Sequence, residues 1–216
     1  MFRIVRQALF AIAFMGMASA GFAKTDLKSL DQATAFARSS KVVRLSVEKS
    51  VVSELLGKET KSEGIVHVRK NRFRWEVDGA EKSTLVYDGT LLWIAAYPPP
   101  GFDEPVQVTK TKINRKSNDQ VLFRLLTGDL VPSKSFTLVS QKTEGSEVSF
   151  VLKGKGEDSG VKDLTVRLQE GTLAGLSYRD DVDNLTDLKI KKRENVKAPG
   201  KNLFKFEIPK GAEVNE

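Results

Sequence analysis

The sequence predicts a mainly β protein of the α+β class, in which one antiparallel sheet curls around a hydrophobic cavity that helices partly cover. From residue 41 onward most of the chain alternates apolar and polar residues, the pattern of strands with one dry and one wet face. Turn signals separate these runs at intervals of roughly 8 to 12 residues, which is typical of consecutive antiparallel strands. Only two short segments have helical spacing, too few to cover the dry face of such a sheet.

The first 23 residues have the layout of a cleavable secretion signal. Arg3 and Arg6 form a positive start, residues 8–17 form an uncharged apolar run, and residues 18–20 and 21–23 offer two small-x-small cleavage sites. The apolar run is well short of the roughly 20 residues that a membrane span needs. We therefore expect a signal peptide over 1–23, one domain over 24–216, and a mature protein dissolved in the periplasm.

Composition argues against most kinds of catalysis. The chain has no cysteine and a single histidine, His67, so thiol nucleophiles, disulfides, lipid attachment to cysteine and common zinc sites are not expected. We expect no catalytic residues, metal or cofactor, and we expect His67 to face the surface of a strand. The formal net charge is +7, but acids are interleaved with the basic residues, so nucleic acid is not an expected partner.

Two helices are expected, one at each side of the first group of strands. The first covers residues 27–37, where apolar residues recur every three or four positions, and Asp31 near its start favours the positive end of the helix dipole. The second covers 119–127, with Ser117 as its cap and Gly128 at its C-terminal end. The buried positions expected in these helices are Leu27, Leu30, Ala33, Thr34 and Ala37 in the first, and Val121, Leu122, Leu125 and Leu126 in the second.

The strands follow from the alternation. In residues 65–77, Phe73, Trp75 and Val77 are expected on one face and Arg72, Arg74 and Glu76 on the other. Asp88-Gly89 predicts a hairpin between residues 85–87 and 91–95. Further strands are expected at 43–47, 106–109, 136–138, 148–152, 164–168, 173–178, 186–190 and, closing the sheet, 204–208.

The cavity wall is expected to consist of large apolar side chains from alternating strand positions and from the second helix. This expectation depends on Phe73, Trp75 and Trp93 sharing one concave face, and each residue could equally be ordinary core. Arg72 and Arg74 are interpreted either as a solvated strand face or as a basic patch that docks an acidic partner. The candidate cavity residues are Val47, Phe73, Trp75, Leu85, Trp93, Phe136, Phe150, Leu188 and Phe206 on strands, and Leu122, Leu125 and Leu126 on the helix.

Four segments, in order, resemble the outer-membrane lipoprotein carrier (LolA) family. Residues 69–77 are similar to the family's R-P-x-x-F-R-W-x-Y strand, although Lys70 replaces its proline. Residues 85–93 resemble its D-G-x-x-l-W hairpin, 184–190 its N-x-T-x-i strand, and 204–214 its closing F-x-f-x-x-P-x-G-x-e-V segment. The likeness extends over nearly the whole chain after the signal.

The resemblance implies an unclosed β-barrel with a helical lid, and a cavity for the acyl chains of lipoproteins. It implies that Arg69 tethers the lid, that the protein is not an enzyme, and that it has two partners: an inner-membrane ABC-type lipoprotein-releasing complex and an outer-membrane lipoprotein receptor. A monomer is the simplest state for such a periplasmic chaperone.

Two other functions stay open from the residues. One is a lipid- or lipoprotein-sensing regulatory module of the same fold, although such regulators usually carry a second domain for which we expect no room. The other is a hydrolase that uses paired carboxylates such as Asp180-Asp181, which we expect to be solvated.

Overall fold

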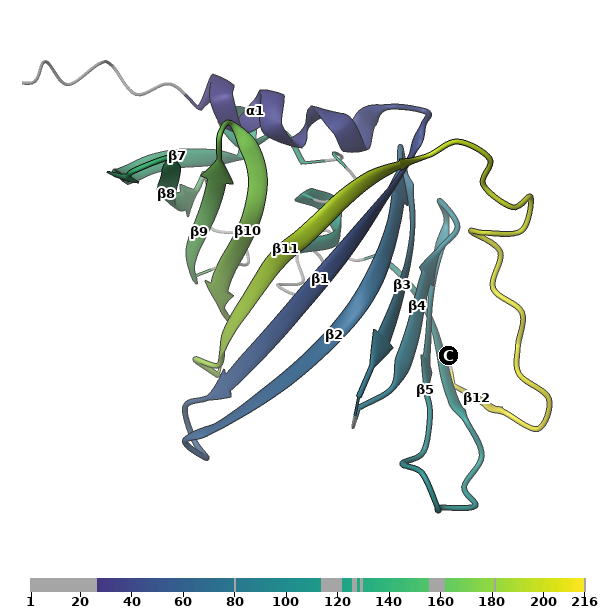
Figure 1. The fold of residues 1–216 in the computed structure, drawn as a ribbon. Coiled ribbons are helices and arrows are strands. Elements are labelled where there is room, and N and C mark those ends of the chain that lie inside the picture. The colour runs from purple at the N-terminus through teal and green to yellow at the C-terminus, as the bar shows by residue number, and fades with distance from the viewer. Residues whose placement is uncertain are drawn as a thin grey trace, which may run out of the picture.

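A single open sheet forms most of the molecule (Figure 1). The structure, a computed structural model, describes residues 27–79, 81–113, 122–125, 128, 130–155, 162–180 and 182–215. The strand order is β12-β6-β5-β4-β3-β2-β1-β11-β10-β9-β8-β7. The strands are β1 (Val42–Ser53), β2 (Lys58–Arg69), β3 (Arg72–Asp78), β4 (Ser83–Tyr87), β5 (Leu91–Ala96), β6 (Gln107–Lys112), β7 (Phe136–Glu144), β8 (Glu147–Gly154), β9 (Lys162–Gln169), β10 (Thr172–Arg179), β11 (Leu185–Val196) and β12 (Glu213–Asn215).

The sheet is mixed rather than wholly antiparallel, which corrects the sequence prediction. Short β12 pairs with β6 in parallel, whereas the other neighbouring strands are antiparallel. The expected closing strand at 204–208 is also wrong, because these residues form no strand. They belong to a segment that connects β11 to β12, residues 197–212, which we call the C-terminal segment (yellow in Figure 1). Its aromatic side chains pack on a face of the sheet instead of adding a strand to its edge.

The two faces of the sheet differ as the alternation predicts. Val43 and Leu45 pair with Val68 and Val66, and Val66 in turn pairs with Trp75. Paired residues point to the same side of a sheet, so these side chains share one face, which we call the inner face. All five are buried in one apolar cluster that also includes residues of β7 to β11.

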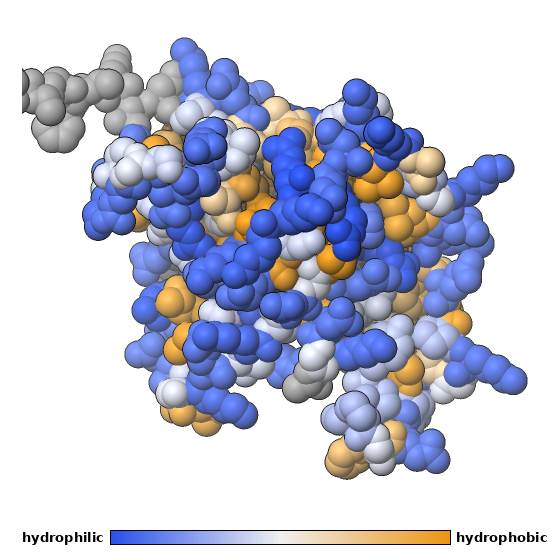
Figure 2. Space-filling view, viewed as in Figure 1, coloured by the Kyte–Doolittle hydropathy of each residue, from blue (hydrophilic) through white to orange (hydrophobic). Residues whose placement is uncertain are grey.

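The opposite, outer face is charged over the middle strands. Arg44 pairs with Glu194 at 3.0 Å and Lys191 with Glu48 at 2.7 Å. Figure 2 shows this side as mostly hydrophilic over β11, β1 and β2. These pairs are partly or largely exposed, so they contribute little to the free energy of unfolding and serve mainly to keep the face solvated.

Short helices cover one end of the inner face. Helix α1 (Lys28–Thr34) continues as the 3₁₀ helix η1 (Ala35–Arg38), and its predicted apolar face is confirmed, since Leu30, Thr34 and Ala37 are fully buried. The Asp31 carboxylate accepts hydrogen bonds from the backbone N–H of Ser133, at 3.0 Å, and from the Ser133 hydroxyl. Asp31 thus binds the start of helix α3 (Pro132–Ser135) and holds the two helices together.

The predicted second helix is seen only in part. Residues 122–125 are helical, while Ser117, residues 119–121 and Leu126 lie outside the described residues. Gly128 has φ +70° and donates its N–H to the Leu125 carbonyl at 3.1 Å, which confirms its expected place at the helix end.

The antiparallel order gives the sheet two unlike ends. The β2–β3, β4–β5 and β9–β10 turns lie at the end that α1 crosses (Figure 1). The β1–β2, β3–β4, β5–β6 and β10–β11 turns lie at the opposite end, which we call the open end.

Candidate functional site

A pocket of about 400 Å³ lies on the inner face, between the sheet and the helical segment 122–125. Volumes of this order are typical of small-molecule sites. The pocket has an apolar interior and a polar rim. Its interior side chains are Trp75, Val77, Leu85, Leu92, Ile94, Leu122, Phe123 and Tyr178, and its rim side chains are Lys49, Ser62, Glu81, Ser83 and Thr111.

Strand register brings the apolar wall together. Trp75 on β3 pairs with Leu85 on β4, and Leu85 pairs with Ile94 on β5. The three side chains therefore form a row across the inner face. Trp75 is buried, and Leu85 and Ile94 are half-buried beside open volume, so the row presents a surface suited to an aliphatic ligand.

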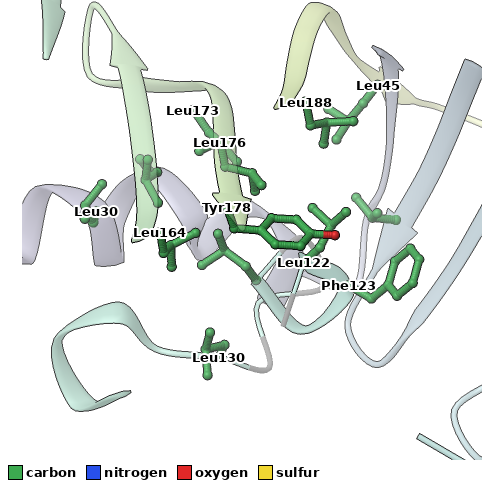
Figure 3. Packing of buried hydrophobic residues seen from close by; sticks show 14 of the residues in the cluster. Leu30, Leu45, Leu122, Phe123, Leu130, Leu164, Leu173, Leu176, Tyr178 and Leu188 are labelled. Carbon is green, nitrogen blue, oxygen red and sulfur yellow. The ribbon is translucent and has the colours of Figure 1, made fainter. Parts of the chain in front are cut away.

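Phe123 of the helical segment fills the space beside this row. Its ring stacks on Phe73 at 4.5 Å between centroids and meets Trp75 edge-on at 5.8 Å. Figure 3 shows Tyr178 of β10 pointing toward Leu122 and Phe123 from the other side. The helical segment 122–125 thus covers the interior of the molecule and also packs into it. A ligand that entered deeply would displace Phe123.

Gly64 makes room for the indole of Trp75. A Cβ at position 64 would lie 2.8 Å from Trp75 Nε1 and 2.4 Å from the Glu76 carbonyl oxygen, so only glycine fits. The Nε1–H is buried and has no hydrogen-bond partner within the described part of the chain. A buried donor of this kind costs about 1–3 kcal/mol when unpaired, which leaves one polar group in an otherwise apolar wall.

Most predicted wall residues lie on the inner face, but few line the pocket. Trp75, Leu85 and Leu122 do so. Others are buried in the surrounding cluster, namely Val47, Phe73, Leu125, Phe136, Phe150 and Leu188. Leu126 lies outside the described residues.

The expectation that Trp93 shares a face with Phe73 and Trp75 is wrong. Trp93 pairs with Val86, whereas the inner-face residue Leu85 pairs with Ile94. On the outer face Trp93 stacks on Phe206 of the C-terminal segment, with ring centroids 5.2 Å apart and planes 9° apart. Phe206 is therefore also misplaced by the sequence prediction, and neither residue is part of the inner pocket.

Five residues of the pocket interior were not among the candidate residues from the sequence, namely Val77, Leu92, Ile94, Phe123 and Tyr178. Residues 91–96 are apolar on both faces, so alternation alone gives no direction for β5. The register of the β4–β5 hairpin would have given the direction of β5. Its turn pairs Tyr87 with Leu92, which places Leu85 opposite Ile94 and directs Trp93 to the outer face. Phe123 adjoins the predicted apolar face of its helix, but sequence does not indicate which ring would fill the interior.

The basic candidates lie near the outer face. The Arg69 guanidinium lies 5.3 Å from the centroid of the Phe204 ring, so its described contact is with the C-terminal segment. Arg69 and Arg72 border a separate pocket of about 570 Å³ beneath that segment. Arg74 pairs with Glu76 at 2.9 Å, which partly neutralises the docking patch predicted from the sequence.

Two further features bear on the kind of site. Within the ranges that the structure describes, no group of three or more His, Cys, Asp or Glu residues is arranged to hold a metal ion. No helix among the described residues has both the length and the apolar character needed to cross a bilayer.

Together the fold and the pocket define a class: mainly β proteins built on one open sheet, with short helices packed over an apolar interior. The chain belongs to the outer membrane lipoprotein carrier protein LolA family, whose model matches residues 45–207. This is a family of carriers, so the chain is a transport protein for lipoprotein localisation and not an enzyme.

Individual proteins agree with this assignment. An outer-membrane lipoprotein carrier protein of Actinobacillus pleuropneumoniae serotype 3 is 31% identical over 99% of this chain and 95% of its own length. One from Legionella pneumophila strain Corby is 30% identical over 68% of this chain and 69% of its own. Among solved structures, an uncharacterized conserved protein from Thermus thermophilus shares the fold, with a TM-score of 0.50 and 13% identity over 87% of this chain and 97% of that one.

Proposed function

We propose that the protein is a periplasmic chaperone that binds the acyl chains of lipoproteins released from the inner membrane and carries them to the outer membrane. The observation that carries this proposal is the apolar pocket on the inner face of a chain that belongs to the lipoprotein carrier family. Acylated lipoproteins are the cargo, and the apolar wall around Trp75, Leu85 and Ile94 receives their chains.

The physical need for such a carrier is large. Each buried methylene is worth about 0.8 kcal/mol, so one long acyl chain is worth on the order of 10 kcal/mol. A molecule with two or three such chains does not leave a membrane for water unaided. A soluble carrier must offer apolar surface of comparable extent and then release it, which requires binding but no covalent chemistry.

Loading requires the helices to act as a lid. A pocket of about 400 Å³ is small for several acyl chains, and Phe123 occupies the space next to it. The sheet forms an unclosed barrel, and segment 122–125 moves away from Phe73 and Trp75 as cargo enters. Phe73, Val47, Leu125, Phe136, Phe150 and Leu188 then become part of the acyl-binding surface.

Arg69 holds the closed form, although its partner is not the one expected. Its contact with Phe204 connects the β2–β3 turn to the C-terminal segment, and the neighbouring Lys70 N–H donates to the Ser39 carbonyl at 3.1 Å. Through this turn the arginine acts on the end of η1, next to the lid.

The expected partners follow from the proposed role. An inner-membrane ABC-type lipoprotein-releasing complex loads the carrier, and an outer-membrane lipoprotein receptor, where the cell has one, unloads it. The signal peptide, residues 1–23, directs export and is then removed, and the mature protein of residues 24–216 works as a monomer.

Docking to the loading complex involves Arg72 and Arg74. Arg72→Glu is expected to slow cargo loading severalfold without changing the midpoint of urea unfolding, because Arg72 is exposed. Arg74→Glu should also slow loading, but it should lower the midpoint as well, because Arg74 is half-buried and loses its ion pair with Glu76. Unchanged loading would assign the two residues to a solvated strand face. The measurement is the rate at which labelled lipoprotein enters the soluble fraction.

A matched pair of variants on β5 tests the function itself. Ile94 lines the pocket, whereas Leu91 lies on the opposite face of the same strand. Ile94→Glu is expected to weaken binding of a fluorescent diacylated peptide at least about tenfold, because a carboxylate in the apolar wall must stay solvated or be neutralised. Leu91→Glu should change the affinity less than about threefold, because this half-buried side chain lies on the face of β5 opposite to the pocket. Equal effects of the two variants, or no binding by the unaltered protein, would contradict the proposal.

A further inference from the structure

We propose that the open end of the molecule is a membrane-contacting surface that inserts shallowly into a zwitterionic phospholipid bilayer. This inference rests on the proposed carrier function and adds a partner to it. Acyl chains would then pass between bilayer and pocket without crossing water.

The first observation is the position of the exposed apolar side chains. Leu55 and Leu56 are 91% and 73% exposed in the β1–β2 turn, Val182 is 70% exposed in the β10–β11 turn, and Phe102 is 63% exposed in the β5–β6 turn. All three turns lie at the open end. Figure 2 shows apolar surface at the two lower tips of the molecule, over the β1–β2 hairpin and the β5–β6 loop.

The second observation is that the pocket has most of its polar rim on the same side. Lys49 pairs with Ser62 on the stretch of β1 and β2 that leads to the Leu55 turn. Glu81 lies in the turn between β3 and β4, and Ser83 is the first residue of β4. Both are also at the open end. Four of the five rim residues therefore lie toward the exposed apolar tips, whereas Thr111, which pairs with Leu92 near the β4–β5 turn, lies toward the α1 end.

The form of this surface fits a bilayer better than a protein partner. Protein interfaces have a contiguous, desolvated core, whereas here the apolar residues sit singly or as one pair on separate turns. A lipid interface accepts such separate side chains, because it needs no matching shape and gains energy from each apolar group that enters it.

The charges next to these residues favour a zwitterionic bilayer. Glu54, which precedes Leu55, is paired with Arg179 at 3.5 Å. Exposed Asp103 and Glu104 follow Phe102, and exposed Asp183 follows Val182. These acids repel anionic headgroups, so the attraction is apolar and binding should be weaker to vesicles rich in anionic lipid.

The experiment is flotation of the exported, purified protein with phosphatidylcholine vesicles. Wild-type protein is expected to float with the vesicles, and the double variant Leu55→Ser, Leu56→Ser to float at least about tenfold less, since two leucines no longer enter the apolar layer. Val139→Ser is the matched control: Val139 is 61% exposed on β7, outside the open-end turns, and this variant should behave as wild type. Equal flotation of wild type and the double variant would overturn the inference.

A second readout is independent of the stability of that variant. The chain has no cysteine, so Leu56→Cys and Val139→Cys each accept one environment-sensitive dye. A blue shift with vesicles is expected at position 56 alone, and no shift there would overturn the inference. Diacylated-peptide binding in vesicle-free solution is measured alongside. Its absence in the wild type would contradict the carrier function, whereas peptide binding without vesicle contact would contradict only the membrane surface.

Discussion

At the residue scale, His67 has an environment that sequence alone does not reveal. It lies on the outer face between Arg44 of β1 and Arg74 of β3, with Glu76 nearby. Burial is the main cause that lowers its pKa from 6.5, both arginines act in the same direction, and Glu76 opposes them. The folded protein therefore favours the neutral imidazole.

The lowered pKa of His67 predicts that the free energy of unfolding depends on pH through this side chain. Below pH 6.5 the unfolded state binds the proton more readily than the folded state, so the free energy of unfolding falls as the pH drops toward the folded pKa. We expect the urea midpoint to decrease from about pH 7.5 to about pH 5.5, and to decrease less in His67→Gln. The same decrease in the wild type and in His67→Gln would contradict a lowered pKa of His67. Glu48 and Glu194 have pKa values held low mainly by hydrogen bonds from Lys191 and Lys192, and they titrate alike in both proteins at lower pH.

Gly128 is a second residue with a specific requirement. Its φ of +70° disfavours a side chain, and a Cβ there would lie 2.6 Å from Arg38 Cγ and 2.9 Å from the Arg38 amide nitrogen. Gly171 has a similar φ of +74° with nothing within 4 Å of its Cβ position. We expect Gly171→Ala to lower the free energy of unfolding by about 1 kcal/mol and Gly128→Ala by about 1–2 kcal/mol more, as measured by denaturant unfolding. Equal losses would mean that the end of the second helix does not pack closely on η1.

At the element scale, the C-terminal segment acts as a cover for the outer face of β4 to β6. Val86, Ala95 and Val108 are fully buried outside the main cluster, on strands whose outer face would otherwise be exposed. Phe206 of the segment lies over this region through its stack on Trp93, and Phe204 contacts Arg69 at the end of β2. Here the sheet therefore has apolar side chains on both faces.

The variant Phe206→Ala distinguishes the role of the outer face in stability from the role of the inner face in binding. Loss of its stack on Trp93 is expected to lower the free energy of unfolding by about 1–2 kcal/mol and to speed proteolysis of residues 197–212. Binding of a diacylated peptide should change less than about threefold, because Phe206 is not in the inner pocket. A tenfold loss of peptide affinity, as expected for Ile94→Glu, would contradict this. It would mean that Phe206 is part of the acyl-binding surface, as the sequence predicted.

At the scale of the whole molecule, sequence reasoning succeeded where one face of a strand is charged. The alternation of Phe73 and Trp75 with Arg72 and Arg74 correctly separated the inner from the outer face of β3. It failed for Trp93, because β5 is apolar on both sides and only strand register decides its direction. The 204–208 segment failed for a related reason: alternating Phe residues suit a strand edge or a sheet face equally well, and long-range packing selects the face.

The family assignment and the pocket lead to one central claim, that this protein carries acylated lipoproteins through water. The most direct test adds the mature protein to spheroplasts that produce a tagged outer-membrane lipoprotein, and follows the tag into the soluble fraction. We expect the tagged lipoprotein to appear in solution bound to this protein, and to appear less with Ile94→Glu than with Leu91→Glu. If the lipoprotein stays in the inner membrane while the protein still binds free lipid, the carrier account is contradicted.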